Sequence, residues 1–332
     1  MPFDINEETI KFYRDKKVLI TGGTGTLGSK IGDILFKLNI NCNITCISRD
    51  EYKQWQKKRE GSKLNYILGD ITDPNLNLSN IDIVIHTAAL KHIDFAEKNT
   101  NYAVNNNING TMNLINLANK FNIKYFITVS TDKACLPTNT YGASKFLSER
   151  ITINNLNENM KCCVIRLGNI FASRGSVSHV FHENLMKDNN ITVYNKDMTR
   201  YTVTLDESAK ITINSIIISE GNDVIVPKFE CYKILDLAKV FYKVYKNINI
   251  ENDIEKYINV TQLRKSEKIN EDLICNYEFN NIKEFENYYI CNLKDEDYKN
   301  RYLRENKYIS LNKLENLVKQ FKEQKRINLF KW

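Results

Sequence analysis

The sequence has little of what marks several large classes of protein. Its 332 residues include only four prolines and twelve glycines, too few for a collagen-like chain or an array of Pro/Gly-rich linkers. No segment approaches the ~18 consecutive apolar residues that a membrane helix requires. The N-terminus lacks the basic-then-apolar order of a secretory signal. We therefore expect a cytoplasmic protein that is not inserted in a membrane, and 42% hydrophobic residues allow a core in one or two domains.

The eight cysteines do not follow a metal-binding or disulfide pattern. They are scattered along the chain: Cys42 and Cys46 lie four positions apart, Cys162 and Cys163 are adjacent, and no Cys-x-x-Cys pair with a matching histidine exists. We therefore expect no bound metal. We also expect the thiols to be reduced, as in a cytosolic protein.

The 47 basic and 40 acidic side chains give a net charge of +7. Such a charge suits nucleic acid, an acidic membrane surface or a small anionic ligand about equally. The basic residues do not form a stripe interleaved with aromatic residues, and the densest run, Lys57-Lys58-Arg59, is typical of a solvated helix end. We expect no nucleic-acid or membrane partner.

The first half of the chain alternates short apolar strands with helical stretches. Strands are predicted at residues 17–21, 43–48, 65–68, 82–86, 124–129 and 162–166, and helices at 27–38, 100–121 and 140–157. This alternation predicts an α/β fold with a Rossmann-type, doubly wound parallel sheet. The second half has shorter predicted elements and is more polar, and it ends with a charged helix at 311–324. We expect a dinucleotide-binding domain over 1–170 and a smaller C-terminal substrate-binding lobe over 171–332, partly interleaved with the sheet.

A glycine-rich turn joins the first predicted strand to the first helix. The segment Thr-Gly-Gly-Thr-Gly-Thr-Leu-Gly at 21–28 places glycines at 22, 25 and 28. Glycines there let the backbone approach a pyrophosphate, and the helix N-terminus supplies N–H donors and a partial positive charge. The predicted cofactor contacts in this turn are Gly22, Thr24, Gly25, Thr26, Leu27 and Gly28.

The end of the second strand bears on the choice between NAD and NADP. NAD sites favour an acidic residue there, whereas NADP sites place an arginine near the 2′-phosphate. This chain has Ser48-Arg49, with Lys53 one turn later, which favours NADP. Asp50 complicates the choice, although it could instead cap the following helix. After the third strand, Asp70, followed by Ile71, would suit a contact with the adenine amino group, or simply form a turn.

Tyr141 and Lys145 form the pattern Tyr-x-x-x-Lys. The bare pattern is weak, because Tyr13/Lys17 and Tyr242/Lys246 match it by accident. Tyr141 differs because it opens a long predicted helix directly after the fifth strand. A spacing of four on a helix puts the ammonium beside the phenol, and a nearby cation lowers a phenol pKa that is ~10 when unperturbed. Tyr141 could then take a proton from a sugar hydroxyl while hydride leaves the same carbon.

These motifs, taken in order, resemble those of the extended short-chain dehydrogenases/reductases and, more narrowly, the soluble UDP-N-acetylglucosamine 4,6-dehydratases. The resemblance covers about residues 16–275, and the last fifty-odd residues carry no motif. The segments that carry it are 21–28, Ser-Arg-Asp-Glu at 48–51, Gly-Asp-Ile-Thr-Asp at 69–73, Ala-Ala-Leu-Lys at 88–91, Ser-Thr-Asp-Lys-Ala at 130–134, Tyr-Gly-Ala-Ser-Lys at 141–145, Arg-Leu-Gly-Asn at 166–169, Ser-Arg-Gly-Ser-Val at 173–177 and Met-Thr-Arg-Tyr at 198–201.

The pair Asp132-Lys133 discriminates within this resemblance. Dehydratases acting on glucose carry Asp-Glu there, and epimerases lack a catalytic pair. Oxidation at C4 acidifies the C5 proton, a base removes it, an acid protonates the departing 6-hydroxyl, and hydride returns to C6. The resemblance implies Asp132 as the acid, Lys133 as the C5 base and Thr131 as a hydrogen-bond partner of the C4 oxygen. Asp132 would need a pKa raised by burial in order to donate at neutral pH.

The resemblance also implies contacts to cofactor and substrate. Ala88, Ala89 and Lys91 would lie near the nicotinamide, together with Tyr141 and Lys145. The family's Arg-Pro-Gly-Glu-Lys appears here as Arg-Lys-Ser-Glu-Lys at 264–268, without the Pro-Gly pair. We expect His86, His92 and Cys135 to be structural. The predicted substrate contacts are Lys91, Asn169, Arg174, Val177, Thr199, Arg200, Arg264 and Glu267.

The sequence therefore predicts an NADP-dependent lyase, a C5-inverting UDP-N-acetylglucosamine 4,6-dehydratase that forms UDP-2-acetamido-2,6-dideoxy-L-arabino-hexos-4-ulose. Inversion follows from two resemblances: the chain is short, and it keeps Tyr141 where membrane-anchored retaining relatives often carry Met. The alternatives are a retaining dehydratase, a 4-epimerase, or a non-catalytic NADP-binding sensor. We also expect a homo-oligomer, paired through the helices on either side of the fifth strand.

Overall fold

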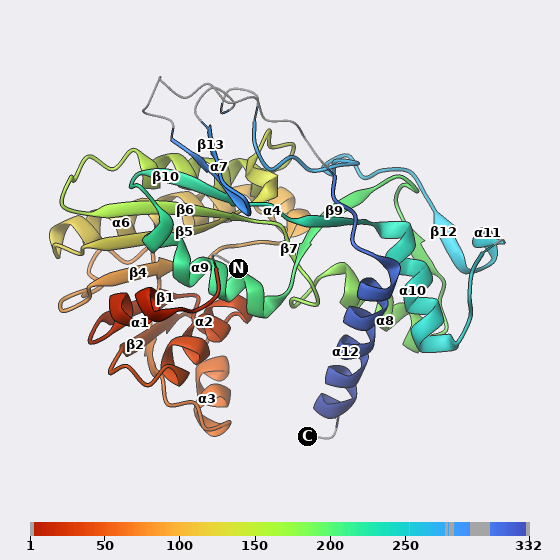
Figure 1. The fold of residues 1–332 in the computed structure, drawn as a ribbon, viewed down its shortest axis with the longest axis horizontal. Helices are drawn as coiled ribbons and strands as arrows, with labels where there is room; N and C mark the ends of the chain where they lie inside the picture. Colours follow the sequence, from red (N-terminus) through yellow and green to blue (C-terminus); the bar gives the residue numbers. More distant parts are fainter. Residues whose placement is uncertain (1–2, 252, 276–277, 279–281, 293–305, 330–332) are drawn as a thin grey trace. The chain divides into compact units, whose positions relative to one another are not determined.

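The computed structural model describes residues 3–251, 253–275, 278, 282–292 and 306–329, and its chain divides into two compact units (Figure 1). The first unit comprises Met1–Leu167, Leu205–Lys228 and Asp272–Leu303. The second comprises Gly168–Thr204, Phe229–Glu271 and Arg304–Trp332. The chain thus leaves the first unit close to the predicted boundary at 170 and returns to it twice. Each unit is described by itself.

The first unit is built on a nine-stranded sheet with the order β13-β14-β10-β6-β5-β4-β1-β2-β3. The run from β3 to β6 has the 3-2-1-4-5-6 order of a Rossmann fold, and its strands are parallel. β10 extends the sheet in parallel, whereas β14 and β13 add antiparallel strands. The strands are β1 (Lys17–Thr21), β2 (Asn43–Ser48), β3 (Asn65–Leu68), β4 (Ile83–His86), β5 (Tyr125–Thr131), β6 (Lys161–Leu167), β10 (Asp223–Pro227), β13 (Ile282–Glu284) and β14 (Tyr288–Cys291).

The central strands are apolar because helices cover both of their faces. All four residues of β4 and all but the first of β1 and β6 are buried, as expected for parallel strands packed between two helical layers. The six strands predicted from the sequence are present, within two residues at each end. β10, β13 and β14 lie outside those predictions.

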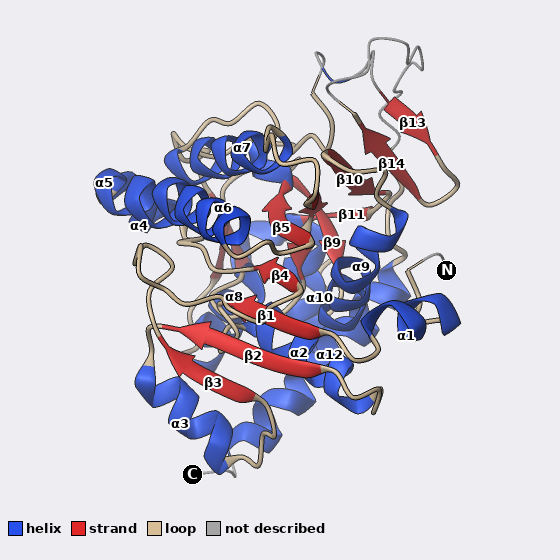
Figure 2. Ribbon diagram, turned by 90° about the vertical axis from the view of Figure 1, so that its left-hand side faces the viewer, coloured by secondary structure: helices blue, strands red, loops and turns tan. Residues whose placement is uncertain are grey.

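Helices pack on each face of this sheet (Figure 2). α4, α5, η1, α6 and α7 form one layer, with α7 against β5 and β6; α1, α2 and α9 form the other, with α9 against the same two strands. In α2 the apolar side chains recur at helical spacing, so Leu27, Ile31 and Leu35 are buried. The helices are α1 (Glu7–Tyr13), α2 (Thr26–Lys37), α3 (Glu51–Arg59), α4 (Ile93–Lys98), α5 (Thr100–Ala103), η1 (Val104–Asn109), α6 (Gly110–Lys120), η2 (Asp132–Ala134), α7 (Thr140–Ile153) and α9 (Leu205–Ile218).

The single helix predicted at 100–121 is three segments in the structure, because a π-helical turn, η1, interrupts it. The wider turn buries Asn107, whose amide accepts a hydrogen bond from the Leu90 N–H (2.7 Å) and donates to the Leu90 carbonyl (3.0 Å). Both the oxygen and the nitrogen of this side-chain amide are therefore bonded to a backbone segment that is distant in the sequence. Helical periodicity along the chain cannot reveal such a partner, and π-turns are frequent at functional sites.

The second unit combines two small sheets with a helical core. Phe181 of α8, Phe241 of α10 and Phe321 of α12 lie in one buried cluster, with the first two ring centroids 5.6 Å apart. No helix in the described part of either unit is both long enough and apolar enough to cross a membrane. The elements are β7 (Asn169–Ile170), α8 (Val177–Met186), β8 (Ile191–Val193), β9 (Thr199–Val203), β11 (Glu230–Lys233), α10 (Ile234–Lys246), α11 (Ile254–Tyr257), β12 (Ile258–Val260) and α12 (Leu311–Leu329).

Candidate active site

The glycine-rich turn between β1 and α2 is a tight backbone cradle. Gly22 has φ +68°, and its N–H donates to the Ile47 carbonyl at 2.8 Å. A Cβ on Gly28 would lie 2.6 Å from the Gly22 carbonyl oxygen, so a side chain there would displace the turn. α2 begins at Thr26 with no side-chain cap and no acidic residue in its first turn. The first N–H groups of α2 therefore suit an anion, and the residues predicted for pyrophosphate binding all lie in or next to this turn.

The loop after β4 lies against the same turn. The Ala88 N–H donates to Thr21 Oγ1 at 3.2 Å, and a Cβ on Gly22 would meet the Ala88 backbone at 3.0 Å. Ala89 and exposed Lys91 follow in this loop. The structure thus brings the predicted nicotinamide-side segment next to the predicted pyrophosphate turn.

At the end of β2, Arg49 and Asp70 form an exposed ion pair at 3.4 Å, and the guanidinium carbon lies 5.5 Å from the Tyr102 ring centroid. Asp50 is the N-cap of α3: its carboxylate accepts the Lys53 N–H at 3.0 Å and pairs with the Lys53 ammonium. Asp50 is therefore engaged as a cap, which was one of the two predicted roles. Ser48, which closes β2, accepts a hydrogen bond from the Gln54 amide at 3.0 Å.

Asp70 forms the turn after β3. Its Oδ1 accepts hydrogen bonds from the Thr72 N–H and hydroxyl, both at 2.9 Å. Burial alone would raise the pKa of Asp70, but these bonds and the Arg49 charge hold it below its ordinary value. Ile71 is buried in the core beneath the turn. The carboxylate is thus ionised at neutral pH, which keeps Arg49 paired.

The catalytic candidates lie where β5 ends. Thr131 Oγ1 donates to Asp132 Oδ1 at 2.9 Å, and the Lys133 ammonium lies 3.0 Å from the same oxygen. Asp132 is fully buried, and its Oδ2 has no hydrogen-bond partner among the described residues. The carboxylate thus has two donors on Oδ1, whereas its buried Oδ2 has none among the described residues.

Tyr141 lies in the first turn of α7, whose N-cap Asn139 accepts the Gly142 N–H at 2.8 Å. A Cβ on Gly142 would lie 2.3 Å from the Lys133 carbonyl oxygen, so α7 packs directly on the backbone of η2. Burial, with the Asp132 charge, raises the pKa of Tyr141 above its ordinary value, and a hydrogen bond with Thr131 opposes this. The expectation that Lys145 lowers this pKa is wrong for this structure, because Asp132 and Thr131 are the groups that act on the phenol.

Lys145 is 3% exposed, and burial lowers its pKa to about 8, with Glu149 acting in the opposite direction. Burial, reinforced by the Lys145 charge, also lowers the pKa of His86 to about 3. His86 is therefore neutral, held between Thr21 Oγ1 (2.7 Å) and Thr111 Oγ1 (3.0 Å). Its role is structural, as the sequence indicated.

Two sets of residues at this site were not singled out from the sequence. Asn107 of η1 donates to Ser144 Oγ at 2.9 Å, which ties η1 and the Leu90 backbone to α7. The sequence around Asn107 gives no sign of the π-helical turn that positions its side chain. A long-range contact of this kind is visible only once the fold is known.

The second set is a buried ion triad, also in the first unit. Arg166 donates to both carboxylate oxygens of Glu149 (3.1 and 2.7 Å) and to both of Glu278 (3.0 and 2.9 Å). Although burial opposes its charge, the two carboxylates hold the pKa of Arg166 well above its ordinary value. Ser130 adds a hydrogen bond to Glu149 at 2.6 Å. The triad ties α7 to β6, and the Ser130 bond ties α7 to the end of β5.

The predicted substrate contacts, apart from Lys91, all lie in the second unit. Arg200 of β9 is 6% exposed and donates to the carbonyls of Thr199 (2.7 Å) and Ile269 (3.1 Å). The exposed Arg264 lies over the Tyr194 ring, 4.1 Å from its centroid, and bonds its hydroxyl.

The remaining substrate candidates occupy neighbouring segments of the second unit. Thr199 Oγ1 donates to Asn270 Oδ1 at 2.5 Å. The buried Glu267 Oε2 has no hydrogen-bond partner among the described residues. Asn169 is in β7, Arg174 is exposed in the next loop, and Val177 opens α8. The structure thus places Thr199 and Arg200 beside the 264–270 segment, and the others elsewhere in the unit.

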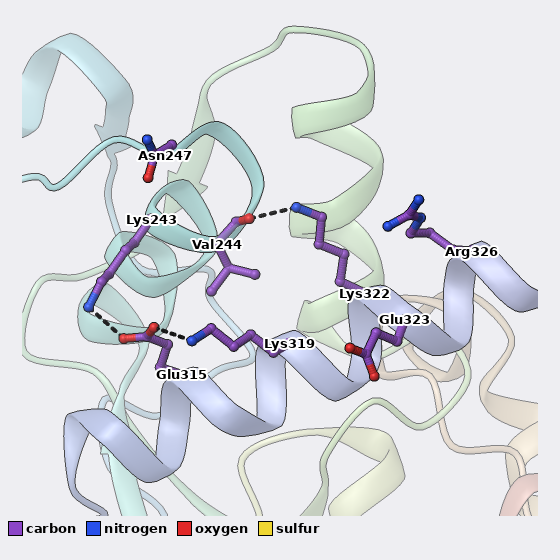
Figure 3. A pocket seen from close by; sticks show the side chains of 8 residues that line it. All are labelled: Lys243, Val244, Asn247, Glu315, Lys319, Lys322, Glu323 and Arg326. Carbon is purple, nitrogen blue, oxygen red and sulfur yellow. Dashed lines mark hydrogen bonds and ion pairs between the residues drawn. The ribbon is translucent and has the colours of Figure 1, made fainter.

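A cavity of about 430 Å³ in the second unit lies along α10 and α12 (Figure 3). Its three lysines are engaged within it: Lys243 and Lys319 contact Glu315 at 2.5 and 2.7 Å, and Lys322 donates to the Val244 carbonyl at 2.6 Å. No predicted site residue lines it, so we assign it no part in the candidate site. Its lining residues are Lys243, Val244, Asn247, Glu315, Lys319, Lys322, Glu323 and Arg326.

The chain is similar to known proteins over most of its length. Residues 18–293 match the family described as "Polysaccharide biosynthesis protein". Over 287 residues the chain is 32% identical to UDP-N-acetylglucosamine 4,6-dehydratase (inverting) of Campylobacter jejuni, covering 83% of each protein. Over 289 residues it is 32% identical to UDP-glucose 4-epimerase of Rickettsia bellii, again covering 83% of each. The X-ray structure of Pen from Bacillus thuringiensis has a TM-score of 0.84 and 30% identity, covering 94% of this chain and 99% of that one.

Proposed function

The chain belongs to the family of polysaccharide biosynthesis proteins, and we propose that it is an NADP-dependent, C5-inverting UDP-N-acetylglucosamine 4,6-dehydratase. It is an enzyme of the nucleotide-sugar dehydratase and epimerase group of short-chain dehydrogenases. The observation that carries the finer proposal is the Asp132–Lys133 pair, joined at 3.0 Å beside Thr131 and Tyr141. An epimerase needs no acid and base for loss of water, whereas a dehydratase needs both.

The pair can reach its working state by one proton transfer. Lys133 must be neutral to remove the C5 proton, and Asp132 must be protonated to donate to the departing 6-hydroxyl. Moving one proton along the 3.0 Å contact from Lys133 to Asp132 produces both states at once. The transferred proton would lie on Oδ1, the oxygen that the Lys133 ammonium contacts. We propose that this transfer precedes elimination.

The same transfer favours the oxidation step. The negative charge of Asp132 is one of the two causes that raise the Tyr141 pKa. When Asp132 is protonated that charge disappears, and Tyr141 can more readily take the proton of the C4 hydroxyl. Thr131 already bonds both groups and would hold the C4 oxygen. Lys145, one turn further along α7 and charged below about pH 8, remains a proposed catalytic residue, although Asp132 and Thr131 are the groups that act on the phenol in this structure.

The residues of the first unit fit a dinucleotide. The Gly22–Gly28 cradle leaves no room for a Cβ, and the start of α2 presents its N–H groups without a side-chain cap. NADP, when bound, would accept hydride from C4 and return it to C6. We propose Arg49 for the 2′-phosphate, because Asp50 is committed to capping α3 and a phosphate would compete with Asp70 for the guanidinium.

We further propose that the second unit binds the UDP moiety. Arg200 and Arg264 have the charge for the diphosphate, and the buried Glu267 Oε2 can accept a ribose hydroxyl. Asn169, Arg174, Val177 and Thr199 complete the proposed contacts of this unit, and Lys91 of the first unit is a separate predicted substrate contact. Each is a prediction that substitution can test through KM for UDP-N-acetylglucosamine.

The proposed enzyme is a cytoplasmic homo-oligomer. Apolar side chains on the helices flanking β5 are partly exposed: Tyr102 46%, Met112 46% and Leu147 43%. A helix face of this kind suits pairing with the same face of a second copy. Sedimentation of a 38.8 kDa species at micromolar concentration would contradict this, and Met112→Glu with Leu147→Glu should produce that species.

Incubation of the purified protein with UDP-N-acetylglucosamine in D2O, followed by NMR, tests the function. The proposal predicts loss of the 6-hydroxyl, a 4-keto sugar, and deuterium at C5 with the L-arabino configuration. Loss of water with retained C5 configuration would indicate a retaining dehydratase, and a C4-inverted sugar that keeps its 6-hydroxyl would indicate an epimerase. Binding of NADP without turnover would indicate a sensor.

A further inference from the structure

Two cysteines far apart in the sequence meet beside the catalytic pair, within the first unit. The Sγ atoms of Cys135 and Cys275 are 2.7 Å apart, although the residues are 140 positions apart in the chain, and both side chains are fully buried. Cys135 directly follows η2, and its N–H donates to the Asp132 carbonyl at 3.1 Å. The Cys275 N–H donates to Glu278 Oε2 at 2.7 Å. One thiol thus belongs to the catalytic loop and the other to the segment that binds Arg166.

We propose that Cys135 and Cys275 are a modification site, a thiol pair that a hydroperoxide or a low-molecular-weight disulfide oxidises reversibly to a disulfide. A disulfide requires sulfur atoms about 2.05 Å apart, so only a small closing movement is needed. With hydrogen peroxide, one thiolate attacks a peroxide oxygen and forms a sulfenic acid, releasing water. The second thiol displaces the sulfenic oxygen as a second water, so two thiols and one peroxide give one disulfide and two waters. With oxidised glutathione, one thiolate forms a mixed disulfide and releases one reduced glutathione, and the second thiol then releases the other.

The same cluster is the one group of three possible metal ligands found among the described residues, with Glu278 as the third. Its chemistry does not favour a metal. Both carboxylate oxygens of Glu278 already accept hydrogen bonds from Arg166, whose fixed positive charge lies within 3.0 Å of them. Two thiols alone fall short of the four ligands that a structural zinc site needs. Oxidation is therefore the reaction that this arrangement favours.

The disulfide would join the catalytic loop to the ion triad. Glu278 holds Arg166, Arg166 holds Glu149, and Glu149 lies on α7, which also carries Tyr141 and Lys145. Leu136, directly after Cys135, has φ +44°, a region that a leucine rarely adopts. A covalent link at Cys135 would limit the movement of η2 relative to this network. The oxidised protein should therefore have a more rigid catalytic end of β5.

Burial also sets the speed of the reaction. The hydrogen bond to Cys275, and then burial, raise the pKa of the Cys135 thiol, so little thiolate is present at neutral pH. The pair should be inert to a brief exposure and should react when the segment opens transiently. This behaviour differs from that of an exposed, acidic redox cysteine.

The test equilibrates the reduced, full-length protein in glutathione buffers of increasing oxidised fraction, with urea below the unfolding transition to speed the opening. Remaining thiols are blocked with iodoacetamide, and the unreduced digest is analysed by mass spectrometry. We expect the peptide containing Cys135 to be joined to that containing Cys275, with a mass lower by two hydrogen atoms. We also expect the Tm to rise by about 5–10 °C and the Lys133 and Cys135 amides to exchange more slowly with D2O.

Matched variants separate this pair from the other thiols. Cys135→Ala and Cys275→Ala should each abolish the joined peptide and the rise in Tm, whereas Cys231→Ala, a buried cysteine of the second unit, should leave both unchanged. None of these readouts needs substrate, so the test is independent of the proposed dehydratase activity. The proposal fails if no buffer yields the joined peptide, or if the link leaves amide exchange at η2 unchanged. It also fails if dialysis against Zn²⁺ alone loads one zinc per chain that Cys135→Ala removes.

Discussion

Polar side chains at different strand ends of the same sheet differ sharply in their exposure to solvent. At the end of β5, Thr131, Asp132 and Lys145 are 8%, 0% and 3% exposed. At the ends of β2 and β3, the side chains of Arg49 and Asp70 are 45% and 37% exposed. Water screens the exposed pair, so it contributes little stability, whereas each buried group depends on its partner. Substitutions at the two places should therefore differ in kind as well as in size.

The largest effect is expected from Lys133→Ala, which removes the proposed C5 base. General acid-base groups typically contribute ~10²–10⁴-fold, so dehydration should slow by about that factor. Hydride transfer should survive, and NADPH with a 4-keto sugar that keeps its 6-hydroxyl should accumulate. Absorbance and NMR measure the two products. Lys120→Ala, at an exposed position of α6, is the control; wild-type dehydration with normal deuterium at C5 in Lys133→Ala would place the base elsewhere.

Glu278→Gln should reduce stability strongly, because it leaves the buried Arg166 with one carboxylate instead of two. Breaking a buried ion pair costs about 3–5 kcal/mol, measurable by urea unfolding. The control is Glu284→Gln, which breaks an exposed pair with Lys228 and should cost about 0–1 kcal/mol. Equal losses in the two variants would remove the distinction between buried and exposed pairs.

Lys145→Met should stabilise the protein at neutral pH. Burial lowers the pKa of Lys145 from 10.5 to about 8 in the fold, so the folded state carries a cost that is fully present below about pH 8. That cost disappears as the pH rises toward 10.5, because the unfolded chain then also loses its proton. The gain should be at most about 3 kcal/mol at pH 7 and should vanish near pH 10.5, measured by urea unfolding at each pH. A gain that is independent of pH would point to packing instead.

The smallest effect on stability, and a clear one on selectivity, is expected from Arg49→Ala. Loss of a charged hydrogen bond to the 2′-phosphate should weaken NADP about tenfold or more, with little change for NAD. The free energy of unfolding should change by less than about 0.5 kcal/mol. Calorimetric titration with both dinucleotides gives the comparison, and equal weakening of the two would exclude Arg49 from this role.

The sequence could predict what depends on neighbours along the chain. The strands from β1 to β6 follow from apolar runs, and the nucleotide turn follows from glycines spaced between a strand and a helix. The π-turn at Asn107, the triad around Arg166 and the contact of Cys135 with Cys275 depend on residues that are up to 140 positions apart. The pKa of Tyr141 was predicted in the wrong direction for the same reason. The pattern showed Lys145 one turn away, but not the Asp132 charge brought to the phenol by the fold.

Gly142 has a consequence for engineering. Because a Cβ there would lie 2.3 Å from the Lys133 carbonyl oxygen, the first turn of α7 sets the position of the loop that carries the proposed acid and base. A laboratory exchange of that loop alone would set a new backbone against this helix turn, which leaves no room for a bulkier path at residue 133. The loop and the start of α7 should therefore be exchanged together, with the junctions of a chimaeric protein placed outside residues 130–145.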